Sequence, residues 1–488
     1  MKKQLKIQTP VTTSGNFRIF VHLLIPLMET LSNISALNSA YLLALEKHRT
    51  DPGSQLLQLN KFLTENNCTF KGQPMPTLLK PNFVSNKQLY LLEQTVGIMS
   101  TALDKFIRLY MESEEVRHIM KFSVLENELF RFEPGYRKPL VISRLDAFLN
   151  GFNVKFLEFN CDSPAGIAYA DILEEGFRQL FGKYSLFDSW KITYTRRQDL
   201  LLRSLLLCYE EYRSHSRQMP EKPVIAIVDW EGVSTYSEFE LHEKHFTANG
   251  YKTLICSPQQ FSIKNGRATV HGEEVHLVYR RVITRELLQQ YEQVTEFIQC
   301  MKEGLVCCCN SFRSYIGGNK KVLSLISNPR FQEIFSKKEL KLIKLTIPWT
   351  EILADNVAYF GGKRINLRDF ITENKDLLVL KPANMYGGKN VYIGLETDQE
   401  TWERVMNQHI ADESWVVQEY VEIPTDIYPE IVEGISFKRK NVNINPFALL
   451  GKYSGTITRV SDSAVINVSA GGGLVPTLGA EPAGSSKE

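Results

Sequence analysis

The chain has 488 residues, of which 43% are hydrophobic and 23% are charged. This length predicts two to four domains, and the composition excludes a largely disordered protein. Because 57 basic residues are balanced by 55 acidic ones, the chain has no net field that would recruit nucleic acid or an anionic membrane. Any anionic ligand must therefore be bound by local charges.

The first part of the chain is predicted to be helical. From residue 17 to about residue 122, apolar residues recur at three- and four-residue spacing. We expect residues 1–125 to form a helical region that supports a neighbouring unit or shapes a substrate pocket. The apolar run 17–28 contains Arg18 and Pro26 and is too short to cross a bilayer, so the expected location is cytoplasmic, with no membrane or nucleic-acid partner.

Residues 126–220 are expected to form the next unit. Here the short apolar runs PLVISRLDAFL and NVKFLEFN flank the turn residues 150–153, which predicts a β-hairpin. Residues 221–300 alternate between strand (222–230), helix (237–250) and further strands, a pattern typical of a small parallel α/β unit. The oligomeric state cannot be predicted from these patterns.

Residues 301–476 are predicted to form another α/β region, and residues 477–488 a flexible tail. We expect Cys307–Cys309 to be buried in a strand, because no cysteine in the chain has zinc-site or C-x-x-C spacing. A helix is expected near 320–326, a strand pair at 378–394, a helix near 400–409 and a strand at 414–421. Two strands followed by a glycine-rich turn are expected within 456–476.

The segment LVLKPANMYGGKNVYIG, at 378–394, is a candidate phosphate-binding element. Lys381 ends its first strand and could reach a nucleotide phosphate, while Gly387 and Gly388 would let backbone amides approach phosphate oxygens. The spacing is neither that of a P-loop nor G-x-G-x-x-G, so a plain hairpin explains it equally well. Downstream, Gln418–Val421 could offer backbone groups to an adenine edge, although an ordinary strand is the more common interpretation.

The predicted hairpin near residue 150 carries a candidate metal site. Glu158 and Asn160 are two residues apart on one strand and therefore share a face. Asp146 lies twelve residues before Glu158 on the partner strand, and Arg144 points to the same face as Asp146. Three oxygen donors from adjacent strands suit Mg²⁺. The alternative is a hairpin that simply shows these charges to solvent.

Taken together, these motifs resemble the circularly permuted ATP-grasp ligases, such as glutathionylspermidine synthetase and eukaryotic glutathione synthetase. The resemblance rests on R-x-D at 144–146, E-x-N at 158–160, Asn-Lys at 319–320 and the K-P strand with its glycine loop. It covers residues 130 to 476 and does not extend clearly to the helical N-terminal region. It implies an α/β (α+β) fold, a circularly permuted ATP-grasp in which 221–300 is an inserted substrate-binding unit.

The resemblance also implies roles for individual residues. Asp146, Glu158 and Asn160 would bind magnesium, and Arg144 would be the catalytic residue over the reacting carboxyl group. Lys320 is preferred to Lys321 because of the Asn-Lys match. The expected ATP-binding residues are Lys320, Lys381, Tyr386, Gly387, Gly388, Lys389, Gln418, Glu419, Tyr420 and Val421. The substrate candidates, for which surface polarity is at least as good an explanation, are Asp162, Ser163, Tyr279, Arg280, Arg281 and Arg459.

The implied activity is that of an ATP-dependent carboxylate-amine ligase with ATP and Mg²⁺ as cofactors. Such an enzyme would form an amide bond through an acylphosphate and release ADP and phosphate. Its partners would be a small-molecule or peptide carboxylate and an amine acceptor. Two alternatives remain open: an ATP-dependent phosphotransferase acting on a small molecule, and a non-catalytic nucleotide-binding scaffold.

Overall fold

The computed structural model describes residues 14–47, 52–182, 184–215, 219–432, 434–466, 468 and 471–484, with side chains from residue 27 onward. Residues 485–488 of the expected tail lie outside this range. The helices are α1 (Ser14–Lys47), α2 (Pro52–Glu65), α3 (Asn86–Glu112), α4 (Glu114–Met120), α5 (Val124–Phe130), α6 (Ile167–Phe181), α7 (Arg197–Ser214), α8 (Tyr236–Ala248), α9 (Thr284–Gln289), α10 (Thr295–Lys302), α11 (Ser314–Gly318), α12 (Lys321–Ser327), α13 (Lys337–Thr346), α14 (Leu367–Glu373) and α15 (Gln399–His409).

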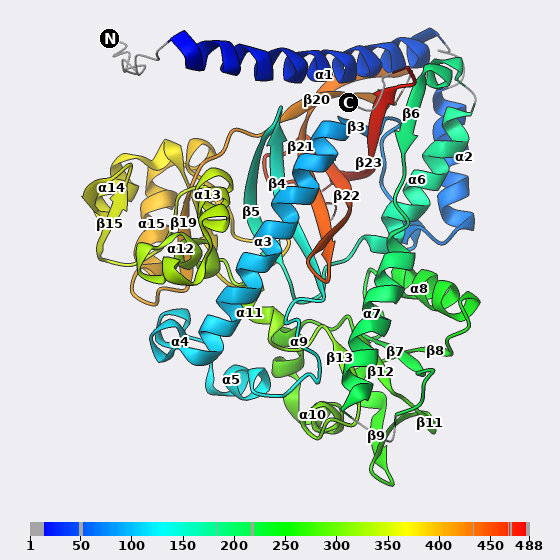
Figure 1. The fold of residues 1–488 in the computed structure, drawn as a ribbon, viewed down its shortest axis with the longest axis vertical. Helices are drawn as coiled ribbons and strands as arrows, with labels where there is room; N and C mark the ends of the chain where they lie inside the picture. Colours follow the sequence, from blue (N-terminus) through cyan, green and yellow to red (C-terminus); the bar gives the residue numbers. More distant parts are fainter. Residues whose placement is uncertain are drawn as a thin grey trace.

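A mixed eight-stranded sheet forms the centre of the molecule (Figure 1). Its order is β3-β23-β22-β21-β4-β5, with β20 paired to β21 and β6 paired to β23. The bounds of these strands are β3 (Asn82–Ser85), β4 (Ile142–Asn150), β5 (Asn153–Asn160), β6 (Trp190–Thr193), β20 (Thr425–Ile431), β21 (Ile435–Leu449), β22 (Lys452–Ser461) and β23 (Gly473–Pro482).

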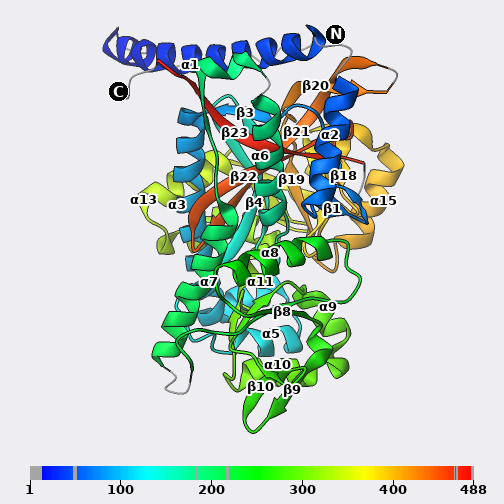
Figure 2. The same cartoon turned by 90° about the vertical axis from the view of Figure 1, so that its right-hand side faces the viewer.

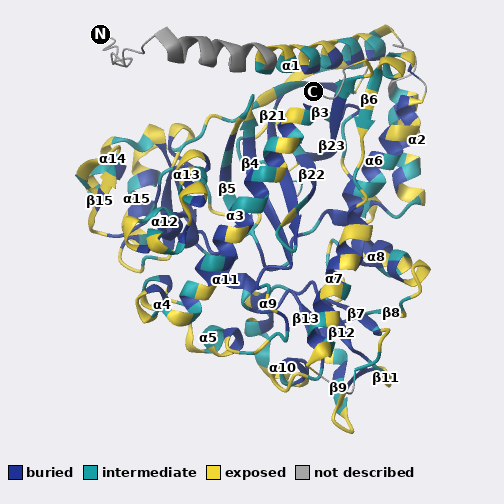
Figure 3. Cartoon of the chain, in the orientation of Figure 1, coloured by how far each residue is buried: buried dark blue, intermediate teal, exposed yellow. Residues whose placement is uncertain are grey.

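Helices cover both faces of this central sheet, as Figures 1 and 2 show. The neighbouring residues Ala448 and Leu449 of β21 point to opposite faces and belong to two different apolar clusters. One cluster contains the buried face of α3, and the other contains that of α6. The strands are therefore buried on both sides and exposed residues concentrate on the outer helices, as Figure 3 shows.

The hairpin predicted around residue 150 is confirmed. Strands β4 and β5 are antiparallel, and their register places Asp146 opposite Glu158 and Arg144 opposite Asn160. The turn that joins them contains Gly151, which has the positive φ of 60° that glycine adopts without strain. Two acids predicted to share a face thus come from directly opposed positions of the two strands.

Strand β23 corrects the prediction for the C-terminal part of the chain. Residues 477–482, expected to lie in a flexible tail, belong to this buried strand, which pairs with β22, with β3 and with β6. A side chain at Gly479 would meet Leu89 of α3 at 2.3 Å, so the small residues allow close packing. Among the described residues of 462–472 there is no strand, so only one of the two strands expected within 456–476 precedes the glycines.

The N-terminal region is also more than a helical layer. Strand β3 pairs in parallel with β23, and a short hairpin of β1 (Thr69–Phe70) and β2 (Gln73–Pro74) follows α2. Residues 1–125, 126–220 and 301–488 each contribute strands to the central sheet. No helix within the described ranges is both long enough and apolar enough to cross a membrane.

The predicted small parallel unit forms a four-stranded sheet. Its order is β13-β12-β7-β8, and every pair is parallel. Cys307–Cys309 form its edge strand β13 and are buried, as predicted, and all eight cysteines are buried and form no disulfide. The other strands are β7 (Ile225–Val228), β8 (Thr253–Cys256) and β12 (Leu277–Arg280), with β9 (Phe261–Lys264), β10 (Arg267–Val270) and β11 (Glu273–Glu274) forming an adjacent small sheet.

A third sheet lies beside β5 and carries the predicted glycine loop. Its order is β14-β19-β17-β18, with antiparallel pairs throughout. The helices α14 and α15 pack against it through a separate apolar cluster centred on Trp402. The strands are β14 (Thr350–Ile352), β17 (Leu378–Pro382), β18 (Tyr392–Ile393) and β19 (Trp415–Glu419), and a small hairpin of β15 (Val357–Phe360) and β16 (Lys363–Asn366) lies nearby.

Candidate functional site

A pocket of about 250 Å³ lies between the third sheet and the central sheet. We call it the inter-sheet pocket. Strands β4, β5 and β22 supply one wall, and β17, β19 and the glycine loop supply the other. Segments more than 200 residues apart in the sequence thus meet at this pocket. The predicted residues that line the pocket are Arg144, Asp146, Glu158, Asn160, Lys381, Tyr386, Gly387, Gly388, Gln418, Glu419, Tyr420, Val421 and Arg459.

Two arginines bind the buried carboxylate of Asp146. Arg144 donates from Nε to Oδ1 at 2.8 Å and from Nη2 to Oδ2 at 3.3 Å, and a third bond joins its Nη1 to the carbonyl of Ala165 at 2.9 Å. Arg459 donates from Nη1 to the same Oδ2 at 2.8 Å. Within the described chain this is the one hydrogen bond of the Arg459 guanidinium, which therefore keeps most of its five donors free.

Two lysines surround Glu158, the other predicted acid. Lys320 Nζ lies 3.2 Å from Glu158 Oε2 and donates to the carbonyl of Met385 at 2.6 Å. Lys381 Nζ donates to Gln418 Oε1 at 2.6 Å. Burial disfavours the ionised carboxyl of Glu158, but Lys320 and Lys381 outweigh it and lower its pKa to about 2.

The same burial acts on Lys381. Desolvation lowers the pKa of its ammonium to about 8, although Glu158 opposes this shift. The neighbouring Lys321 faces away from the pocket and donates to the carbonyl of Ile119 at 3.0 Å, at the C-terminal end of α4. The sequence favoured Lys320 over Lys321 only through the Asn-Lys match. The structure places Lys320, and not Lys321, beside Glu158.

The charges of the inter-sheet pocket do not balance. Arg144, Arg459 and Lys381 line the pocket, and Lys320 lies behind Glu158, so four positive charges stand against three negative ones, those of Asp146, Glu158 and the exposed Glu419. Among the buried and half-buried groups alone, the excess is two positive charges, which is unfavourable unless an anion is bound. The pocket is therefore suited to an anion with several negative oxygens, such as a polyphosphate.

The predicted magnesium ligands have a donor set that fits a hard cation. Asp146, Glu158 and Asn160 offer oxygen donors from opposed strands, and Asn160 Nδ2 is buried without a hydrogen-bond partner. Groups of three or more His, Cys, Asp or Glu suited to a metal are absent from the described part of the chain. Two acids and one amide suit Mg²⁺, because this ion usually completes its shell with water and phosphate oxygens.

The remaining nucleotide-binding candidates differ in their placement. The amides of Glu419 and Tyr420 already donate to the carbonyls of Trp349 at 2.8 Å and Leu377 at 2.7 Å. Within the described residues the amide of Val421 has no partner, so it is the free donor of the predicted hinge. Lys389, by contrast, is exposed and does not line the pocket.

The glycine loop meets a second segment over the pocket. Gly388 has a φ of 69°, and a side chain there would approach Val465 to 2.5 Å. Residues 464–466 line the pocket together with the loop, and the buried hydroxyl of Tyr386 has no hydrogen-bond partner. Residues 464–466 were not identified as site residues from the sequence, because they carry no charge and match no spacing pattern.

The predicted substrate residues of the parallel unit are placed elsewhere. Arg280 is fully buried and donates to Asp162 Oδ1 at 2.7 Å. Arg281 donates to the carbonyl of Pro164 at 2.6 Å and to Glu238 Oε2 at 3.3 Å. Ser163 Oγ donates to the carbonyl of Arg281. These side chains join the loop after β5 to the parallel unit and do not line the inter-sheet pocket.

Tyr279 belongs to the same internal network, because its hydroxyl accepts from Arg281 at 3.4 Å and its side chain is buried. The structure therefore corrects the expectation that Tyr279-Arg280-Arg281 present their polar groups to a substrate carboxylate. The physical reason is that Asp162 and Glu238 already neutralise both guanidinium groups inside the protein. Of the six substrate candidates, Arg459 is the one that lines the inter-sheet pocket.

Comparisons with known proteins bear on the fold. Neither a protein-family model nor a curated protein matches the chain. A glutathione synthetase-like effector from Globodera pallida, solved in its apo form, has a TM-score of 0.60 over 87% of this chain and 96% of its own, at 10% sequence identity. A candidate gamma-glutamylcysteine synthetase from Methylobacillus flagellatus covers 76% of this chain and 83% of its own, but its TM-score of 0.35, also at 10% identity, carries no argument. The chain therefore shares the mixed α/β fold of a glutathione synthetase-like protein.

Proposed function

We propose that this protein is an ATP-dependent carboxylate-amine ligase with the circularly permuted ATP-grasp order. The observation that carries the proposal is the inter-sheet pocket, which gathers residues from 144–160, 381–388 and 418–421 and leaves a positive excess for a polyphosphate. In the permuted order the metal ligands precede the phosphate loop, as Asp146 and Glu158 precede Lys381 here. The fold shared with a glutathione synthetase-like protein supports the same class.

Each wall of the pocket would bind a different part of the nucleotide. Lys320 and Lys381 would bind phosphate oxygens, and the amide of Val421 would donate to the adenine edge. Asp146, Glu158 and Asn160 would hold Mg²⁺, which would supply neutralising charge for the phosphates when bound. The glycine loop, already in contact with residue 465, would exclude water from the reacting groups.

The proposed reaction has two steps. An oxygen of the carboxylate attacks the γ-phosphorus of ATP, ADP leaves, and an acylphosphate forms. The nitrogen of the amine then attacks the acyl carbon, phosphate leaves with the former carboxyl oxygen, and the amine loses a proton. Arg459, with its free donors, and Arg144 would stabilise the negative oxygen that develops on the acyl carbon.

The experiment that tests this proposal measures ADP and phosphate release with MgATP and paired libraries of carboxylates and amines. Release that requires both substrates is the expected result. A stable phosphorylated product formed from one substrate would instead establish the phosphotransferase. ATP binding without turnover, insensitive to Mg²⁺ in both the native chain and the double variant Asp146→Asn, Glu158→Gln, would establish the scaffold.

A further inference from the structure

A second cavity, of about 220 Å³, adjoins the inter-sheet pocket at Arg144 and Arg459. Both arginines line the second cavity as well as the inter-sheet pocket. We call the second cavity the passage. Beyond the arginines its walls are mostly apolar, and Ser234 and Thr235 lie at its other end. Its apolar lining residues are Phe70, Met75, Ala165, Tyr169, Ile457, Val468 and Leu474.

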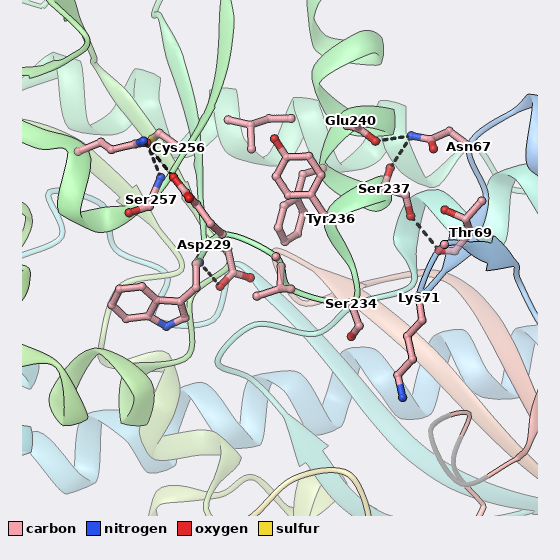
Figure 4. Close-up of a pocket in the computed structure, with 18 of the residues that line it drawn as sticks. Asn67, Thr69, Lys71, Asp229, Ser234, Tyr236, Ser237, Glu240, Cys256 and Ser257 are labelled. Atoms are coloured by element: carbon pink, nitrogen blue, oxygen red, sulfur yellow. Dashed lines mark hydrogen bonds between the residues drawn. The ribbon is translucent and has the colours of Figure 1, made fainter.

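A third and larger cavity, of about 960 Å³, lies next to the passage, and Ser234 lines both. We call it the parallel-sheet cleft. It opens at the C-terminal ends of β7 and β8, where ligands commonly bind on parallel sheets. Figure 4 shows Asp229, which follows β7, with Tyr236 of α8 near it and Lys71 of the β1–β2 hairpin across the view.

The far wall of the parallel-sheet cleft is fixed by hydrogen bonds. Asn67 Nδ2 donates to Glu240 Oε2 at 2.7 Å, and Ser237 Oγ donates to the carbonyl of Thr69 at 2.8 Å (Figure 4). The hydroxyl of Tyr169, which also lines the passage, lies 2.8 Å from Ser237 Oγ. The β1–β2 hairpin is thus attached to α8, and the passage and the cleft keep a defined relation to each other.

Asp229 is the acceptor of the parallel-sheet cleft that remains available. One carboxylate oxygen accepts from the amide of Trp230 at 2.8 Å, and within the described residues no cation forms an ion pair with this group. Two further carboxylates, Glu231 and Glu240, and two basic residues, Lys71 and His271, also line this space, and all four are exposed, whereas Asp229 is half-buried. The interior therefore favours a cationic hydrogen-bond donor.

The three cavities adjoin one another through shared lining residues and differ in chemistry. The arginine pair suits a carboxylate, the apolar passage disfavours an unpaired polar group, and the parallel-sheet cleft offers a carboxylate to a donor. We propose that the acid substrate is an elongated molecule: its carboxylate lies at Arg459 and Arg144, an apolar segment fills the passage, and a terminal ammonium group binds Asp229. This inference rests on the proposed ligase function and specifies its acid substrate.

The test uses hydroxylamine, which traps an acylphosphate as a hydroxamate and replaces the unidentified amine. The full-length protein with MgATP is given ω-amino acids of increasing chain length and, in parallel, unsubstituted acids of the same length. We expect one length of ω-amino acid to be trapped at least about tenfold more efficiently than its unsubstituted match. Asp229→Asn should remove that preference and leave trapping of the unsubstituted acid unchanged.

The control variant is Glu243→Gln, which removes a carboxylate from α8 outside the parallel-sheet cleft and should keep the preference. Preference for short polar acids, or a preference that survives Asp229→Asn, would overturn the proposed substrate while leaving the ligase intact. Hydroxamate formation from no acid of either series, together with no MgATP binding by equilibrium dialysis, would instead overturn the proposed function itself.

Discussion

The inter-sheet pocket and the buried network that joins the loop after β5 to the parallel unit both contain basic side chains and carboxylates. Their charges are matched in the network and unmatched in the pocket. In the network, Arg280 and Arg281 are matched by Asp162 and Glu238. In and beside the pocket, the buried and half-buried cations Arg144, Arg459, Lys320 and Lys381 exceed the acids Asp146 and Glu158 by two charges, and the exposed Glu419 offsets one of them. Matched buried charges hold two segments together, whereas an unmatched excess indicates a place prepared for a ligand.

The largest expected effect comes from removing one partner of an ion pair in the buried network. Arg280→Ala leaves Asp162 buried without its main partner and should lower the free energy of unfolding by about 3–5 kcal/mol. Chemical denaturation measures this change. Replacing both residues, Arg280→Met with Asp162→Leu, should recover part of the loss. A single-variant loss no larger than that of Arg459→Ala would show that the two regions do not differ in this way.

Removing excess charge from the pocket should weaken the ligand and spare the fold. Lys381→Met removes the ammonium that we propose binds the phosphates and should weaken ATP binding by about ten- to a hundredfold, because a charge-assisted hydrogen bond contributes about 1.5–3 kcal/mol. Equilibrium dialysis with MgATP measures the affinity. Lys389→Met is the matched control, since Lys389 lies on the same loop outside the pocket. Equal losses in both variants would contradict the assignment.

The proposed metal ligands should give a smaller and more selective effect. Glu158→Gln should raise the Mg²⁺ concentration needed for half-maximal ATP binding by about tenfold or more, because a charged ligand becomes neutral. The affinity for ATP in the absence of Mg²⁺ should rise or stay unchanged, because the variant adds to the positive excess. An unchanged Mg²⁺ titration would exclude Glu158 from the metal site.

The smallest effect belongs to Glu351, a half-buried acid that forms no ion pair with any residue the structure describes. Burial raises the pKa of Glu351, on β14, from 4.5 to about 7, although a bond from Ser324 opposes the shift. The folded protein therefore binds more protons than the unfolded chain between these values, and the free energy of unfolding should fall as pH rises from 4.5 to 7. Glu351→Gln should stabilise the protein by about 1–2 kcal/mol at pH 8.

The same variant should change stability little at pH 4, where Glu351 is protonated in the folded protein and mostly protonated in the unfolded chain. Denaturation curves at the two pH values measure the difference. Equal stabilisation at both would mean that Glu351 is not ionised on unfolding in the way its burial implies.

Short-range patterns predicted the parts of the site that local rules control. The turn near Gly151 predicted the hairpin, and the period of two placed Glu158 and Asn160 on one face. The β-bulge between Asp146 and Ala147, which brings Asp146 opposite Glu158, was not visible in these patterns. The strand end at Lys381 and the adjacent glycines were visible. These features depend on residues within about twenty positions of one another, where propensity and spacing are informative.

The partners of charged residues were not predictable in the same way. Asp162 meets Arg280 across 118 residues, and a strand-end arginine has the same local pattern whether it is exposed or matched inside the protein. The small residues around Gly479 resemble a tail locally, yet they pair with β3 and pack against α3. The passage and the parallel-sheet cleft were missed because the hairpin that closes them comes from residues 67–75, in the region expected to be only helical.

The position of β21 between β4 and β22 also constrains how the chain can fold during synthesis. Asn443 of β21 bonds to Ala147 of β4 across 296 residues. The β4–β5 hairpin is therefore synthesised long before β21, and until β21 has emerged from the ribosome the edge of β4 lacks its partner strand. We expect chaperone dependence to peak in nascent chains that end before β21 and to decline once that strand has emerged.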